Sequence, residues 1–141
     1  MSTEENKANT RRFFERINQG DLTVIDELCA PNHVSHNAQN TTHGPEEYKQ
    51  SYALLFTAFP DLHFTIEDQL AEGDKVATRI TTSGTHTGDF RGIPPTGKHM
   101  TITGMSISHW VGGKSVEVWI NTDSLGLRQQ IGALPTPGEV K

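Results

Sequence analysis

The sequence predicts a single α+β domain in which helices near the N-terminus cover one face of a curved antiparallel sheet. Up to Pro60 the apolar residues recur at helical spacing, whereas after Pro60 they alternate with polar residues, as in strands. The later segments are also rich in β-branched residues and are separated by short turns that contain glycine. Helices followed by strands are typical of the α+β class. Long strands twist, so we expect the sheet to wrap around the helices as a cone and to enclose an apolar cavity.

Three helices are expected before Pro60. The first ends at the glycine of "INQG" and turns Phe14 and Ile17 toward the core. A short second helix can be capped by Asp21 and ends before Pro31. The third begins at "GPEEY", where a proline suits the first turn. Its apolar residues predict an amphipathic helix that closes at Pro60. They are Tyr48, Tyr52, Leu55, Phe56 and Phe59.

Four successive strands are expected after the third helix, most simply as an antiparallel meander. They are "LHFTIEDQLAE", "KVATRITTSGTHTG", "HMTITGMSISHW" and "SVEVWINTD", and a short helix follows Asp123. We expect one domain over residues 1–134 and a loose tail over residues 135–141. No repeat, linker or second domain is evident in the sequence.

Composition excludes several classes of partner. The chain has 17 acidic and 12 basic residues and no basic run, which argues against binding to nucleic acid or to an anionic membrane. The lone cysteine, Cys29, excludes an intrachain disulfide and suits a reducing compartment. Neither a signal-peptide core nor a membrane-spanning run is visible, so we expect a soluble, cytoplasmic protein.

Metals and cofactors are not expected. His33, His36 and His43 invite a metal interpretation, but H-x-x-H without a third ligand at regular spacing is a weak signal, since zinc usually takes three protein ligands. The "GGK" at Gly112 reads as a hairpin turn, because a phosphate loop has four residues between its glycines.

At "GTHTGDFRGIPPTGKHMT" and "GGKSVEVWINTDSLGLRQQIG" the chain resembles the SnoaL-like polyketide cyclases, which belong to the nuclear-transport-factor-2-like superfamily. The resemblance runs from about Arg11 to Leu134. It implies a cone-shaped α+β fold and cofactor-free intramolecular aldol ring closure, a lyase or isomerase type of chemistry. An aspartate in the last long strand would remove a proton next to a carbonyl, and nearby polar groups would hold the enolate. It also implies a homodimer that packs through the outer face of the sheet.

The chain departs from this family at the catalytic positions. In an ungapped alignment from "GIPPTG" through "GGK", the family's aspartate falls at Ile120 and its polar helpers fall at Gly104 and Ser106. Isoleucine cannot accept a proton, so the cyclase mechanism cannot run as it does in the family.

The hairpin between the last two strands sets which residues face the cavity. A three-residue loop over 111–113 would pair Trp110 with Lys114, and would place Ser106 opposite Val118. A slip of one residue would exchange the two faces of these strands. The expected pocket residues are Phe14, Ile17, Tyr52, Phe56, Ile102, Gly104, Ser106, Val118, Ile120 and Thr122.

The opposite face of these strands suits a dimer interface. It carries Met105, Ile107 and Trp119, fringed by Glu117 and His109.

Two residues are candidates for acid–base catalysis. His36 lies where the family places a histidine that points into the cavity, and histidine is the usual acid–base group near neutral pH. The alternative is a loop histidine that is bonded to backbone. Asp123 could act as a base at the mouth of the cavity, or it could cap the last helix.

Three functions remain open on the sequence. The leading hypothesis is a cyclase-like enzyme that acts on an apolar, polycyclic carbonyl compound by proton transfer or ring closure, with His36 as the acid–base group and Ser106 as a hydrogen-bond donor. The alternative is a non-catalytic protein that binds an apolar metabolite, which the loss of the catalytic aspartate at Ile120 favours. A hydrolase ranks last, because only Asp123 is available as an inward carboxylate.

Overall fold

A computed structural model describes residues 2–37, 40–135 and 138, and these residues form an α+β fold, as predicted. The helices are α1 (Thr3–Asn18), α2 (Thr23–Leu28), α3 (Gly44–Ala58) and α4 (Ser124–Gln130). The strands are β1 (Cys29–Asn37), β2 (Thr41–His43), β3 (His63–Glu72), β4 (Lys75–Thr85), β5 (His99–Val111) and β6 (Lys114–Thr122). All six strands belong to one sheet with the order β2-β1-β6-β5-β4-β3. The tail expected over 135–141 lies almost wholly outside the described residues.

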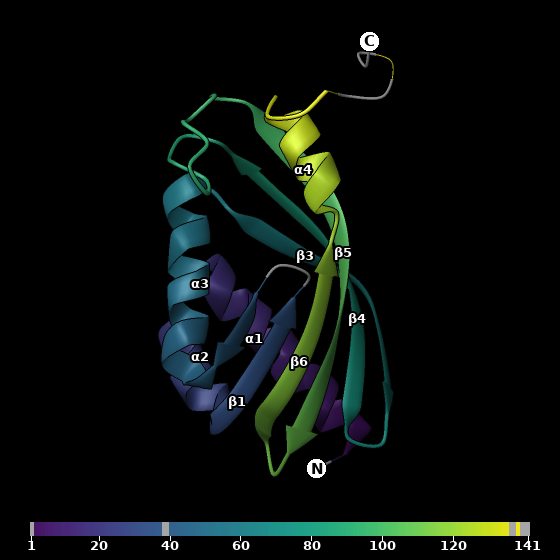
Figure 1. The fold of residues 1–141 in the computed structure, drawn as a ribbon. Coiled ribbons are helices and arrows are strands. Elements are labelled where there is room, and N and C mark those ends of the chain that lie inside the picture. Colours follow the sequence, from purple (N-terminus) through teal and green to yellow (C-terminus); the bar gives the residue numbers. More distant parts are fainter. Residues whose placement is uncertain (1, 38–39, 136–137, 139–141) are drawn as a thin grey trace.

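The sheet curves, and α1, α2 and α3 lie against one face of it, while α4 lies at one end (Figure 1). Two clusters of buried side chains fill the space between the helices and the sheet. The larger cluster joins α1 and α3 to the centre of the sheet through Phe13, Tyr52 and Val118, among others. The smaller one joins the end of α3 to α4 through Phe59 and Ile131. The sheet does not close, so the fold is the open cone that the sequence predicts.

The predicted meander is confirmed for β3 to β6, whose neighbours all pair antiparallel. Two further strands, β1 and β2, are not predicted from the sequence. β1 pairs parallel with β6, with His36 opposite Trp119, and antiparallel with β2. Its sequence, "CAPNHVSHN", is polar and contains Pro31, so it lacks the β-branched alternation that marked the other strands.

The hairpin between β5 and β6 differs from the one expected. Its loop has two residues, Gly112 and Gly113, which have φ angles of +57° and +82°. Positive φ at both central positions is the geometry that glycine permits in the tightest hairpins. Val111 pairs with Lys114, and an irregularity after His109 shifts the pairing further along the strands. The predicted register was therefore wrong by two residues, an even number, so the same side chains share a face as in the expected register.

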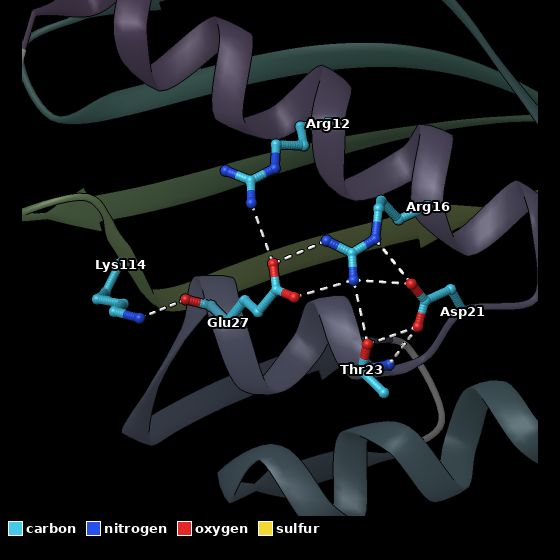
Figure 2. Close-up of polar contacts among 6 residues, drawn as sticks. All are labelled: Arg12, Arg16, Asp21, Thr23, Glu27 and Lys114. Carbon is cyan, nitrogen blue, oxygen red and sulfur yellow. Dashed lines mark hydrogen bonds and ion pairs between the residues drawn. The ribbon is translucent and has the colours of Figure 1, made fainter.

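A polar network on the surface joins α1 to α2 (Figure 2). The Arg16 guanidinium donates to Asp21 at 2.8 Å, to Glu27 at 2.7 Å and to the Thr23 hydroxyl at 3.1 Å. The hydrogen bond to Arg16 is the main cause that holds the pKa of Glu27 below its usual range. Bonds from Thr23 and Arg16 lower the pKa of Asp21 in the same way. Lys114 of β6 also donates to the Glu27 backbone carbonyl, so the network reaches the sheet.

We expect Arg16→Leu to lower the melting temperature at pH 7 and to have little effect at pH 3. A carboxylate whose pKa is lowered in the folded state stabilises the protein above its unfolded pKa of about 4, and this contribution is lost as the pH falls through the folded value. Thermal unfolding of both proteins between pH 3 and pH 8 tests this. The matched control is Arg11→Leu, because Arg11 donates to the neutral amide of Gln69. An Arg16 effect that did not change with pH would contradict the expectation.

The loop between β4 and β5 crosses very close to the end of α3 at Gly88. A Cβ atom at this position would lie 2.0 Å from the carbonyl oxygen of Thr57. The Gly88 amide also donates to the Ala58 carbonyl at 3.1 Å. Only glycine permits this approach of loop to helix.

We expect Gly88→Ala to lower the free energy of unfolding by about 1–3 kcal/mol, because the added methyl group forces two backbones apart. Thr87→Ala is the matched control, since Thr87 is the exposed neighbour and a surface change of this kind typically stays within about 0.5 kcal/mol. Urea unfolding of both variants measures the difference. Equal free energies of unfolding for the two variants would show that the loop accommodates the methyl group without loss of stability.

Candidate functional site

A small cavity lies between α1, α3 and the strands β1, β5 and β6. Its volume is about 30 Å³, closer to a few water molecules than to a polycyclic compound. The lining residues are Thr10, Phe13, Phe14, Cys29, His33, Tyr48, Ser106, Ser108, Trp110, Ser115, Val118 and Ile120. The wall is thus mainly aromatic and aliphatic, with one histidine and a group of hydroxyls.

His33 is the histidine that lines this cavity. Its side chain is 1% exposed, and neither ring nitrogen has a hydrogen-bond partner among the described residues. The ring lies against Tyr48, with the two ring centres 4.8 Å apart. Burial lowers the pKa of His33 to about 4, although the charge of Glu117 acts in the opposite direction. The imidazole is therefore neutral at physiological pH, with one nitrogen free to accept a hydrogen bond and one free to donate.

The other titratable groups in the wall are also neutral. Burial raises the pKa of the Cys29 thiol to about 12, so it is not a thiolate. Burial raises the pKa of Tyr48 well above its ordinary value. Burial also raises the pKa of the neighbouring Tyr52, to about 12. No carboxylate is among the lining residues. Acid–base chemistry in this cavity therefore falls to His33 and the hydroxyl groups.

Two of the hydroxyl groups are already held by neighbours. The Trp110 indole donates to the Ser108 hydroxyl oxygen at 2.8 Å. The Thr10 hydroxyl donates to the Asn6 carbonyl of the preceding turn of α1 at 2.9 Å. Ser106 lies next to Ser108 on the same face of β5 and opposite Ile120.

The predicted pocket residues divide into three groups. Phe14, Ser106, Val118 and Ile120 line the cavity. Ile17, Tyr52, Phe56 and Ile102 instead lie in or against the two core clusters. Gly104 and Thr122 pair with each other farther along β5 and β6, beyond the cavity. The cavity lies near the β5–β6 hairpin, whereas the predicted pocket residues extend toward the other end of these strands, to Ile102 and Thr122.

His36 does not line the cavity. Its Nε2 lies 2.5 Å from the Glu117 carboxylate, and its ring stacks on Trp119 with the centres 5.7 Å apart. The expectation that it points inward was wrong because it lies in a strand. His33 and His36 are three residues apart in β1, and side chains at odd spacing in a strand project to opposite faces.

Asp123 caps α4. Its carboxylate accepts a hydrogen bond from the Gly126 amide at 2.8 Å, and the residue is exposed. It is not among the lining residues, so the structure supports the capping interpretation of the two that the sequence left open.

From the sequence, His33 is a candidate only for a metal site, and its position in the cavity is not predicted. In the structure, buried and less buried residues alternate along β1, with His33 and Ser35 on one face and Val34 and His36 on the other. That signal becomes readable only once residues 29–37 are known to be a strand. Tyr48 and Trp110 were missed for a similar reason, because an aromatic residue in a core pattern and one that lines a cavity have the same periodicity.

No helix in the described ranges is both long and apolar enough to cross a membrane. Among the same residues, no group of three or more histidine, cysteine or acidic side chains is arranged to hold a metal ion.

Comparison with solved structures places this architecture among known proteins. AclR from Streptomyces galilaeus, described as a candidate hydroxylase, is 31% identical, with a TM-score of 0.86 over 95% of this chain and 100% of that one. A candidate SnoaL-like polyketide cyclase from Jannaschia is 26% identical, with a TM-score of 0.87 over 94% of this chain and 95% of that one. IdmH from Streptomyces antibioticus, a candidate polyketide cyclase, is 32% identical, with a TM-score of 0.80 over 90% and 98% of the two chains.

A search of curated proteins finds no match. The sequence pattern of the family described as "SnoaL-like polyketide cyclase" matches residues 8–131, which is nearly the whole chain. The match includes every residue that lines the cavity. The chain therefore belongs to the SnoaL-like polyketide cyclase family.

Proposed function

We propose that the protein is a cofactor-free enzyme that transfers a proton at the carbon next to the carbonyl of an apolar compound, with His33 as the acid–base group. The observation that carries this proposal is the state of His33, which is buried in the cavity wall with both ring nitrogens unpartnered. A buried polar group without a partner costs free energy, and such groups cluster at functional sites. Ring closure and isomerisation both begin with this proton transfer.

The basicity of His33 fits the role that an aspartate plays in the family. Its pKa of about 4 is close to that of an ordinary aspartate, about 3.9. Near pH 7 the imidazole is therefore unprotonated and able to accept a proton. Ile120 occupies the wall where the family alignment places the aspartate.

The cavity also favours one class of ligand. Its lining groups are uncharged at neutral pH, so an apolar, neutral carbonyl compound suits it better than an ion. A cavity of about 30 Å³ has room for a few water molecules, so even a small ring system requires the cavity walls to move apart. A polycyclic compound, the larger substrate class that the family resemblance suggests, requires α1 and α3 to move away from the sheet.

We expect the protein to catalyse exchange of the C2 protons of 1-indanone in D2O, followed by NMR, and His33→Gln to lower the rate by roughly 10²–10⁴-fold, the usual contribution of a general base. The rate should be flat from pH 8 to about pH 5 and fall near pH 4, because protonation of His33 removes the base. His36→Gln is the matched variant on the outer face and should retain the rate.

Two results would count against this assignment. Exchange that survives in His33→Gln but is lost in His36→Gln would restore the outer histidine as the base. Saturable binding of 1-indanone without exchange would favour the second candidate function, a binding protein for apolar metabolites, which the isoleucine at position 120 and the lack of a lining carboxylate support.

We also propose a homodimer through the outer face of the sheet. The strand register aligns Leu70, Ala77, Ile107 and Trp119 in a row across β3, β4, β5 and β6. Leu70 is 70% exposed and Ile107 is 43% exposed, and Met105 lies beside them at 61%. An apolar row of this length on a sheet face suits burial against a second copy.

We expect Ile107→Asp to convert a dimer to a monomer in analytical ultracentrifugation, because it buries a charge at the centre of this row. Leu54→Asp, which changes an equally apolar and exposed residue on α3, should leave the mass unchanged. A wild-type protein that is monomeric at high micromolar concentration would rule out the interface.

A further inference from the structure

We propose, building on the proton-transfer function above, that Ser108 donates a hydrogen bond to the carbonyl oxygen of the ligand and that Trp110 is the positioning residue that fixes the direction of this bond. Both residues line the cavity together with His33. The proposal assigns the oxygen-binding role to a position on β5 that lies beyond the family's helper positions, Gly104 and Ser106.

The chemistry of the indole group decides which residue donates in the hydrogen bond between Trp110 and Ser108. An indole N–H can only donate, so the Ser108 oxygen is the acceptor in the 2.8 Å contact with Trp110. The hydroxyl proton of Ser108 must then point away from the indole. Trp110 is 3% exposed and Ser108 is 6% exposed, so water does not compete readily for either group.

The neighbours of Ser108 leave the cavity as the direction for that proton. Its partners on the adjacent strands are Val76 and Val118, whose side chains cannot accept a hydrogen bond. Among the described residues, the only side-chain hydrogen bond of Ser108 is the one that it accepts from Trp110. A hydroxyl held in this way is a donor that is already oriented before a ligand arrives, and orientation in advance is what makes such donors effective.

Ser108 and His33 then supply the two halves of one proton transfer. The free nitrogen of His33 takes a proton from the carbon next to the carbonyl, so a C–H bond breaks and an N–H bond forms. The electron pair of the C–H bond becomes the new C=C bond, and the carbonyl π electrons move to oxygen. Ser108 stabilises the charge that develops on this oxygen, and His33 later returns its proton, so no oxidant or cofactor is consumed.

The test compares binding of 1-indanone and indane, which share a ring skeleton but differ in the carbonyl group. We expect the wild-type protein to prefer the ketone, and Ser108→Ala to lower this preference roughly 3- to 10-fold while the affinity for indane stays the same. Trp110→Phe, which keeps an aromatic ring but removes the N–H, should lower the preference by less. The double variant should lose no more than Ser108→Ala alone, because the two residues act through one hydrogen bond.

Ser108→Thr keeps the hydroxyl and should retain the preference, whereas Thr103→Ala, on the exposed face of the same strand, should change nothing. The proposal is overturned if Ser108→Ala keeps the preference, if the two single effects add in the double variant, or if neither compound binds. Should Trp110→Phe fail to fold, the comparison of Ser108→Ala with Ser108→Thr decides alone. A ketone preference that depends on Ser108 but comes without proton exchange would support this inference and remove the proposed catalytic function, so the two fail separately.

Discussion

The arrangement of the site depends on the parallel pairing of β1 with β6. This pairing places Val34 opposite Glu117 and His36 opposite Trp119. Because side chains alternate along a strand, the same register turns His33 toward the helices and into the cavity wall. One contact between distant segments thus separates two histidines that lie three residues apart. His33 becomes a buried, neutral imidazole, and His36 pairs with the carboxylate of Glu117.

Burial also determines the charge state of the cavity. Loss of solvation lowers the pKa of His33 and raises those of Cys29 and Tyr48, and each shift favours the uncharged form. The interior therefore has no formal charge near pH 7, and its polar groups act through hydrogen bonds. In such surroundings each well-placed hydrogen bond is stronger than it would be in water. The proposed chemistry relies on a neutral base and on a donor that is oriented in advance, the roles proposed for His33 and Ser108.

The sequence predicted those parts of the fold that depend on local periodicity. The helical spacing around Tyr48 and Tyr52 indicated α3, and strict alternation indicated the four strands from β3 to β6. The faces of β5 and β6 were also predictable, because an error of two residues in register preserves them. β1 was not predictable in this way, since Pro31 and its polar neighbours have weak strand preference and are held by pairing with β6. The position of His33 in the cavity was not predictable for the same reason, because the pairing of β1 with β6 orients its side chain and leaves no local sequence pattern.

The spacing of β5 and β6 also bears on the proposed difference from the family's catalytic residues. A Cβ atom at Gly104 would lie 2.9 Å from the Asn121 carbonyl oxygen and 3.0 Å from the Thr122 methyl carbon, so a polar helper at this position would require β6 to shift. Replacing Ile120 by aspartate would therefore not restore the family's arrangement by itself, because the neighbouring strand has no room for the partner. The hydroxyl groups of the cavity lie closer to the β5–β6 hairpin, at Ser106, Ser108 and Ser115. They line the same cavity as His33, which lies on β1. The proposed catalysis therefore relies on groups that lie nearer the hairpin, with the buried imidazole of His33 on β1 as the base and Ile120 at the position that the alignment matches to the family's aspartate.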